Sequence, residues 1–226
     1  MEENINMTAE RSLEIITEQI AQSRCAVSKR TGQSLYISGL CTMGMAVVVP
    51  IITLLLKTTL GHLLWFALPF IILFALRTID KNQEHAPVNF VGNLVGKTWV
   101  TFGIFGLGFF TLSIVWNSIL SHSVTDPMAF VAHRVNFSPI IFLLMGMAVA
   151  MTGHILKSKW LVWFGIIASM VIAIGSYAGV GEMILARCGA PLQMVAWSNS
   201  FLPCVSVFVF ALFGLLLPGW MLKKQK

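Results

Sequence analysis

Residues 34–56 read SLYISGLCTMGMAVVVPIITLLL, a run of 23 residues without a charged side chain. An α-helix rises about 1.5 Å per residue, so about 20 residues cross a hydrocarbon core of about 30 Å. This run is long enough and apolar enough for that crossing. It does not alternate strictly between apolar and polar residues, as a strand of a membrane barrel would. The stretch therefore predicts a membrane-spanning α-helix.

Five further apolar runs follow, and with the first they predict an all-α fold, a polytopic bundle of six transmembrane helices. The second run is the shortest and lies at the lower length limit for spanning. A five-span chain in which this run is re-entrant is therefore the alternative topology. The five runs are 60–76, 98–120, 137–156, 160–181 and 200–222.

The composition of the whole chain agrees with a membrane location. Of the 226 residues, 57% are hydrophobic and 11% are charged, and the mean hydropathy is +0.82. A soluble domain carries about 25% charged residues. So few charges would hydrate the surface of a soluble globule poorly, whereas they suit a surface that faces lipid. The lipid bilayer is therefore the first expected partner.

The basic residues predict the orientation of the bundle. With the N-terminus in the cytoplasm, twelve of the 15 Lys and Arg residues fall on the cytoplasmic side, and Lys57, Arg134 and Arg187 fall outside. The positive-inside rule then favours an N-in/C-in chain, and an even number of spans places both ends on one side. No basic stripe with interleaved aromatic residues lies outside the runs, so the net charge of +6 predicts no nucleic-acid partner.

The polar N-terminal segment predicts two parts, a cytoplasmic helical extension over 1–33 and a six-helix transmembrane domain over 34–222. Five acidic residues in the extension argue against a cleavable signal peptide. Thr8 is a predicted N-cap for a helix that begins at Ala9. Gly32 predicts a break before the first span.

The predicted N-terminal helix is amphipathic. Leu13, Ile16, Ile20 and Val27 recur at helical spacing on one face. One interpretation lays the helix on the inner leaflet, with that face against lipid, or on the other cytoplasmic loops. The other makes these four residues a docking face for a cytoplasmic or membrane protein partner, or for a second copy in a homo-oligomer.

Small residues and prolines predict where the helices pack and bend. Small side chains at every fourth position let helices approach closely in a bilayer. Proline removes a backbone donor and kinks a helix. The predicted packing residues are Gly165, Ser169, Ala173, Gly175 and Gly179, and the predicted hinges are Pro50, Pro69 and Pro203.

The six runs offer little to catalysis. None carries Asp, Glu, Lys or Arg at its middle, where a transporter or enzyme would place functional charges. Cys41 and Met45 share one helix face, as do Met147, Met151 and His154, and soft ligands of this type can select Cu(I). Methionine also fills gaps in apolar cores, and we prefer that explanation. We therefore expect that this protein is not an enzyme and that it has no catalytic residue, no cofactor and no metal site.

The N-terminal sequence resembles the start of a group of bacterial multi-pass membrane proteins. TAERSLEII at 8–16 and SKRTG at 28–32 carry the resemblance, together with the hydropathy layout of about six spans. The group is uncharacterised, so the resemblance implies no functional residues. It implies a place in the cytoplasmic (inner) membrane of a bacterium. Small proteins of this kind sometimes accompany a DNA-binding regulator, which adds weight to a regulatory role.

Two functions remain open at this point. In the first, a non-catalytic membrane protein binds a partner through the helix 8–30 and the loop 77–97. In the second, the bundle is a small transporter or channel for a neutral or amphiphilic solute. The first is favoured because nothing in the sequence commits the bundle interior to a substrate. A polar cavity that opens to one side would support the second function.

Overall fold

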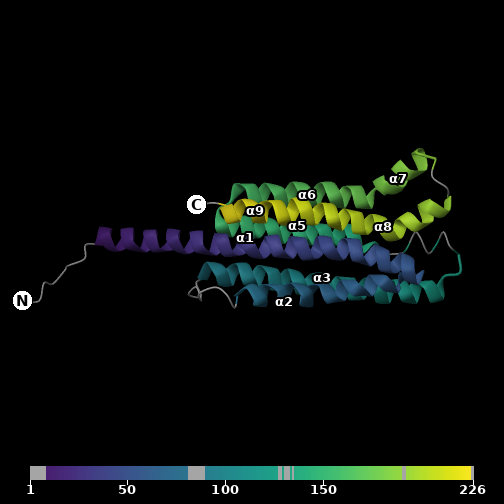
Figure 1. The fold of residues 1–226 in the computed structure, drawn as a ribbon, viewed down its shortest axis with the longest axis horizontal. Coiled ribbons are helices and arrows are strands. Elements are labelled where there is room, and N and C mark those ends of the chain that lie inside the picture. The colour runs from purple at the N-terminus through teal and green to yellow at the C-terminus, as the bar shows by residue number, and fades with distance from the viewer. Residues whose placement is uncertain are drawn as a thin grey trace, which may run out of the picture.

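The computed structural model describes residues 9–80, 90–126, 129, 133, 135–189 and 192–224. Every regular element in these residues is helical, so the prediction of an all-α chain is confirmed. Figure 1 shows the elements lying nearly parallel in an elongated bundle. The elements are α1 (Ala9–Leu56), the 3₁₀ segment η1 (Thr59–Ala67), α2 (Leu68–Asp80), α3 (Phe90–Ser123), α5 (Phe137–Leu156), α6 (Lys159–Tyr177), α7 (Val180–Arg187), α8 (Leu192–Phe210), the π-helical segment η2 (Ala211–Leu216) and α9 (Leu217–Lys224).

Six of the described helical stretches are long and apolar enough to cross a membrane, as a multi-pass membrane protein requires. The shortest predicted run, 60–76, lies in one unbroken helical segment built from η1 and α2. That is the arrangement a six-span chain needs. The stretches are Ala26–Leu56, Leu60–Thr78, Phe90–Ser123, Phe137–Leu156, Lys159–Tyr177 and Phe201–Lys224.

The helix α1 continues through Gly32, so the break predicted there is wrong. Gly32 is buried because α9 packs directly onto it. A Cβ atom at this position would lie 2.7 Å from Leu222 Cβ and 2.9 Å from the Gly219 carbonyl oxygen. The glycine therefore allows two helices to approach closely, and the helix does not end there. With 48 residues, α1 is about 72 Å long, which is more than twice the hydrocarbon thickness.

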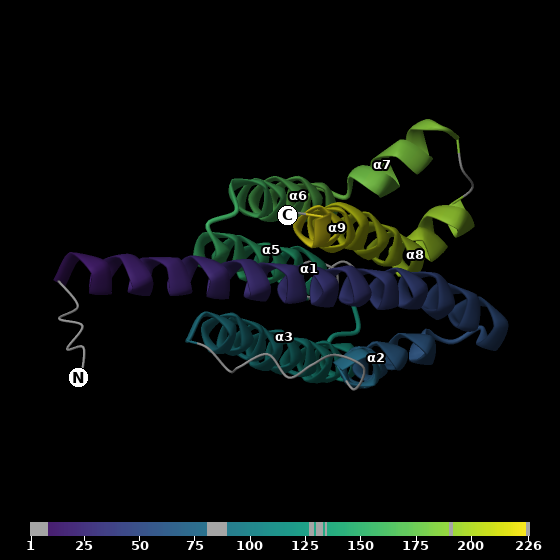
Figure 2. The ribbon, with the colours of Figure 1, turned by 60° about the vertical axis from the view of Figure 1, so that its left-hand side comes forward.

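Close contact between α1 and the C-terminal helical region repeats about two turns further along α1. A Cβ atom at Gly39 would lie 3.0 Å from the backbone nitrogen of Leu216, and one at Gly219 would lie 2.6 Å from that of Tyr36. The glycines thus bring the backbone of α1 close to the backbones of η2 and α9. Figure 2 shows α2 and α3 on one side of α1 and α5, α6, α8 and α9 on the other.

The helices α5 and α6 form the most tightly packed pair. Lys157 takes a left-handed backbone conformation, φ 57°, and turns the chain back so that the two helices are antiparallel. A Cβ atom at Gly165 would lie 2.8 Å from the backbone nitrogen of Ala150, and one at Gly146 would collide with the Ser169 side chain. Phe142 of α5 packs against Phe210 of α8, with ring centroids 5.8 Å apart. Both rings are fully buried in the main core.

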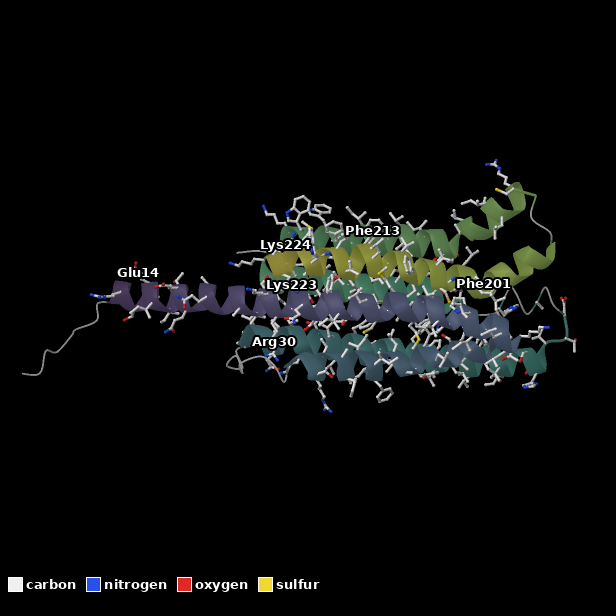
Figure 3. All side chains as sticks on the ribbon, in the orientation of Figure 1. Glu14, Arg30, Phe201, Phe213, Lys223 and Lys224 are labelled. Atoms are coloured by element: carbon white, nitrogen blue, oxygen red, sulfur yellow. The ribbon has the colours of Figure 1, made fainter. Side chains whose placement is uncertain are left out.

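The charged side chains gather at the two ends of the bundle. Arg30, Lys223 and Lys224 lie at one end in Figure 3, the end beyond which Glu14 projects. Lys224 Nζ lies 3.9 Å from the Trp220 ring centroid. Successive long helices run in opposite directions (Figure 1). The end that carries Arg30 therefore also carries Arg77, Lys157 and Lys159, and the opposite end carries Lys57 and Arg187.

Candidate functional site

The N-terminal part of α1 extends beyond the end of the bundle, as all three views show. Lys223 Nζ lies 5.9 Å from the centroid of the Tyr36 ring, so the end of α9 lies beside the span of α1 and not beside its N-terminal part. Val27 still packs against the main core. Residues 9–25, which precede it, form what we call the projecting segment. The Thr8 cap predicted for this helix lies outside the described residues.

The projecting segment exposes apolar side chains. Leu13 is 64% exposed and Ile16 is 51% exposed. Its polar groups bond locally, because Thr17 Oγ1 donates to the Leu13 carbonyl oxygen at 2.7 Å. The side chain of Ile20 lies outside the described residues. The predicted four-residue face is therefore divided: Leu13 and Ile16 are free to meet another molecule, while Val27 belongs to the bundle.

The direction of the projecting segment argues against the interpretation that lays it on the inner leaflet. An unbroken helix continues along the axis of its own membrane span, because only a break or a sharp kink would turn it into the membrane plane. Pro50, a predicted hinge, lies inside α1 but near its other end. The projecting segment thus continues the helix of the first span, with Leu13 and Ile16 exposed.

The predicted packing residues separate into two groups. Gly165, Ser169 and Ala173 are buried in α6, and the first two face α5. Gly175 has no heavy atom within 4 Å of an added Cβ atom. Gly179 adopts φ 61° in the turn after α6. Because this turn ends α6 at Tyr177, the predicted end of the fifth span at 181 is wrong.

A cavity of about 420 Å³ opens where Gly175 leaves space, at the end of the bundle far from both described chain ends. The last turns of α3 and α6, the first turn of α5, and parts of α7 and α8 surround it. Five of the described lining residues have polar side chains, and none of the described lining residues is charged. The polar residues are Asn117, Asn136, Ser138, Ser176 and Ser206.

Two asparagines fix the chain beside this cavity. Asn117 Nδ2 donates to the Val135 carbonyl oxygen at 3.1 Å, and the Val135 backbone N–H donates to Asn117 Oδ1 at 3.0 Å. Asn136 caps α5, because its side-chain oxygen accepts from the Ser138 backbone N–H at 3.1 Å. These bonds tie the chain entering α5 to the end of α3.

The hydroxyl groups of Ser176 and Ser206 differ from those of three threonines in the spans. Thr42, Thr53 and Thr152 each donate to the carbonyl oxygen four residues earlier, at 2.7–2.8 Å. Within the part of the chain that the structure describes, no hydrogen bond is found for the Ser176 and Ser206 hydroxyls. A polar group in an apolar medium is stabilised by a partner. The two hydroxyls can therefore bond to a ligand in the cavity.

A second cavity of about 380 Å³ continues from the first along the outside of α6. Its lining is apolar and includes Trp160, Trp163, Phe164, Ile167 and Phe213. The two cavities share Val171, Ile172 and Val209. Together they form one groove between α6 on one side and α8 with η2 on the other, which we call the α6–α8 groove.

The π-helical segment η2 forms part of the second wall of this groove. The Leu217 backbone N–H donates to the Leu212 carbonyl oxygen, five residues earlier. Pro218 has no N–H to offer the carbonyl of Gly214 and would crowd it in a regular helix, which accounts for the wider turn. Pro218 was not among the predicted hinges, although a proline inside an apolar run is a visible signal. Phe213, on η2, reaches the groove.

Two of the predicted hinges, Pro203 and Pro69, lie within helices of the bundle. Pro203 lies inside α8 and lines the polar cavity. Pro69 occupies the second position of α2, directly after the 3₁₀ segment, where its missing N–H costs little. This position marks the change from a 3₁₀ to an α-helix, near the middle of the Leu60–Thr78 span.

The sulfur-containing side chains considered as copper ligands lie in different surroundings. Met45 is buried with Val49 and Cys204 in a small cluster. Met147 and Met151 are 56% and 48% exposed on the surface of α5. Among the described residues, no group of three or more His, Cys, Asp or Glu side chains is placed to hold a metal ion. The two sets do not meet in one site.

Comparison with known proteins adds no relative to this picture. The resemblance of residues 8–16 and 28–32 to a bacterial membrane-protein group stays a prediction, and so does the bacterial origin. No protein-family model, curated protein or solved structure matches this chain.

Proposed function

We propose that this chain is a non-catalytic, multi-pass membrane protein that binds a helical protein partner through the projecting segment of α1. The exposure of Leu13 and Ile16 on a helix that leaves the bundle carries this proposal. A regulatory or scaffolding role follows from it, because such a segment brings a partner to the membrane without chemistry.

The physical argument rests on exposed apolar area. Burying a leucine or isoleucine side chain is worth about 1.5–3 kcal/mol. The projecting segment is only slightly longer than the about 12–15 residues below which an isolated helix is marginal in water. The projecting segment is extended from a stable span, which nucleates it, yet its apolar residues gain nothing in water. A partner helix that packs on Leu13 and Ile16 would bury them and stabilise the segment.

The proposed orientation has both termini in the cytoplasm of a bacterium, in its inner membrane. The distribution of Lys and Arg supports it, because the end of the bundle with Arg30, Lys223 and Lys224 is the richer in basic residues. The projecting segment would then meet cytoplasmic proteins or the cytoplasmic part of another membrane protein.

Site-specific photocrosslinking tests the proposal. A photoreactive phenylalanine analogue replaces Ile16 in one variant and Gln22 in a matched control. On a helical wheel Gln22 lies about 120° from Ile16, on the side of Glu18, whose carboxylate oxygen accepts from Gln22 Nε2 at 3.3 Å. We expect a discrete protein adduct, identified by mass spectrometry, from position 16 only. Equal adducts from both positions, or lipid adducts alone at position 16, would contradict it.

A further inference from the structure

We propose that the α6–α8 groove binds a membrane lipid with an uncharged, hydrogen-bonding headgroup, such as a glyceride, with its acyl chain along α6. This inference is independent of the partner proposed for α1, because none of the described residues that line the groove belongs to α1, and the polar cavity lies at the end of the bundle opposite to the projecting segment.

The apolar part of the groove has the length and lining that an acyl chain needs. From Ser176 back to Phe164 is twelve residues of α6, which is about 18 Å along the helix. That exceeds half of a hydrocarbon core of about 30 Å, the depth of one leaflet. Trp163 and Phe213 border the deeper part of this stretch.

The polar part of the groove determines the headgroup. Ser176 and Ser206 offer hydroxyl groups, and Asn117 lines the same cavity. A phosphate would need Arg, Lys or several backbone donors to offset its charge. No Arg or Lys is found among the described residues that line either cavity. An uncharged headgroup with hydroxyls satisfies the serines without bringing an unpaired charge into the membrane.

A lipid can enter the groove from the side. Ile167 and Val171 line the groove and are 55% and 65% exposed, so the groove faces the hydrocarbon region. The two cavities measure about 420 and 380 Å³, within the range of known small-molecule sites. The groove is therefore a preformed site that opens sideways toward the lipid. Only the end that would hold the headgroup is polar.

Photoaffinity labelling of the full chain in phosphatidylcholine nanodiscs tests this inference. The probe is 1-oleoylglycerol that carries a diazirine in its acyl chain. We expect saturable labelling of peptides from α6 and from the α8–η2 region, and we expect unlabelled 1-oleoylglycerol to compete for it. Oleoyl lysophosphatidylglycerol, which has a similar tail and an anionic headgroup, should compete at least about tenfold less well.

Two variants connect the labelling to the groove. Gly175→Phe fills the polar cavity and should remove the saturable labelling. Its matched control is Gly108→Phe, because Gly108 also has no heavy atom within 4 Å of an added Cβ atom but lies exposed on α3. The double variant Ser176→Ala with Ser206→Ala adds no bulk, so it decides the matter if Gly175→Phe does not fold. It should raise the half-saturating probe concentration about tenfold.

Three results would overturn the inference. Labelling that does not saturate would show ordinary lipid contact only. A preference for the anionic competitor would show a charged-lipid site. Labelling of folded Gly175→Phe, or of the double alanine variant, at the unmodified level would place the lipid elsewhere. Ile16→Asp should leave labelling unchanged, so failure of this inference is distinguishable from failure of the proposed partner site.

Discussion

Gly32 of α1 and Gly219 of α9 lie against each other, and a Cβ atom on Gly32 would stand 2.9 Å from the Gly219 carbonyl oxygen. This contact joins the first and last helices of the bundle. It also fixes the level at which α1 leaves the bundle, because α9 ends one turn later at Lys224. The projecting segment lies on the N-terminal side of this contact, beyond Val27, which still packs against the main core.

The first prediction concerns this contact. Gly32→Ala should lower the free energy of unfolding by about 1–3 kcal/mol, because the added methyl group forces two backbones apart. Gly44→Ala is the control on the same helix, since an added Cβ atom there meets nothing within 4 Å. It should be neutral or stabilising by up to about 1 kcal/mol. Unfolding in detergent, followed by circular dichroism, measures both. An equal loss in the two variants would contradict the contact.

The second prediction concerns α5 and α6. Gly146→Ala should destabilise the protein by about 1–3 kcal/mol because its methyl group collides with the Ser169 side chain. Ser169→Gly in the same chain removes the obstructing atoms, so the double variant should recover part of the loss. A double-mutant cycle measures the coupling, for which we expect at least about 0.5 kcal/mol in the favourable direction. Strictly additive losses would show that the two residues do not meet.

The third prediction concerns the connection from α3 to α5. Asn117→Ala removes both hydrogen bonds to Val135 and should lower stability by about 1–3 kcal/mol. Asn93→Ala is the control, because Asn93 is an exposed side chain on the same helix. We expect its effect to stay within about 0.5 kcal/mol. Thermal unfolding of the two purified variants compares them, and losses of equal size would refute the role given to Asn117.

The fourth prediction concerns orientation. A fluorescent protein fused after Lys226 should fold and fluoresce, whereas alkaline phosphatase at the same position should be inactive, because the positive-inside rule holds the C-terminus in the cytoplasm. A phosphatase inserted after Lys57, at the opposite end of the bundle, should be active and serves as the control. The reverse pattern would place both termini outside the cytoplasm.

The sequence predicted a multi-pass helical membrane protein because each span must satisfy the length and hydropathy that a bilayer requires on its own. Length and hydropathy are local properties, so residues 137–156 could be recognised as a helix without any knowledge of their neighbours. Small-residue spacing was a weaker signal. It was right in position for Gly165 and Ser169, which face α5, but Gly175 shares the residue type and faces open space.

Features that depend on distant partners could not be predicted in the same way. A glycine before a span resembles a helix end, and only the approach of Gly219 makes Gly32 a packing position. The α6–α8 groove collects side chains from several helices, such as Asn117, Ser176 and Ser206, that no local pattern connects. The serines and Asn117 are ordinary residues in the sequence, and they form a site only because the bundle places them together.

The helix α1 is unbroken from the membrane span to the projecting segment, and the proposed partner site depends on this continuity. Pulsed electron paramagnetic resonance on spin labels at Glu14 and Leu40, in a variant without native cysteines, tests it directly. These positions are 26 residues apart, so a continuous helix predicts a narrow distribution near about 39 Å in nanodiscs. Labels at Leu40 and Leu54, within the span, should give about 21 Å as the reference. A broad distribution for the first pair, or one centred below about 30 Å, would show a break near Gly32 and contradict the claim.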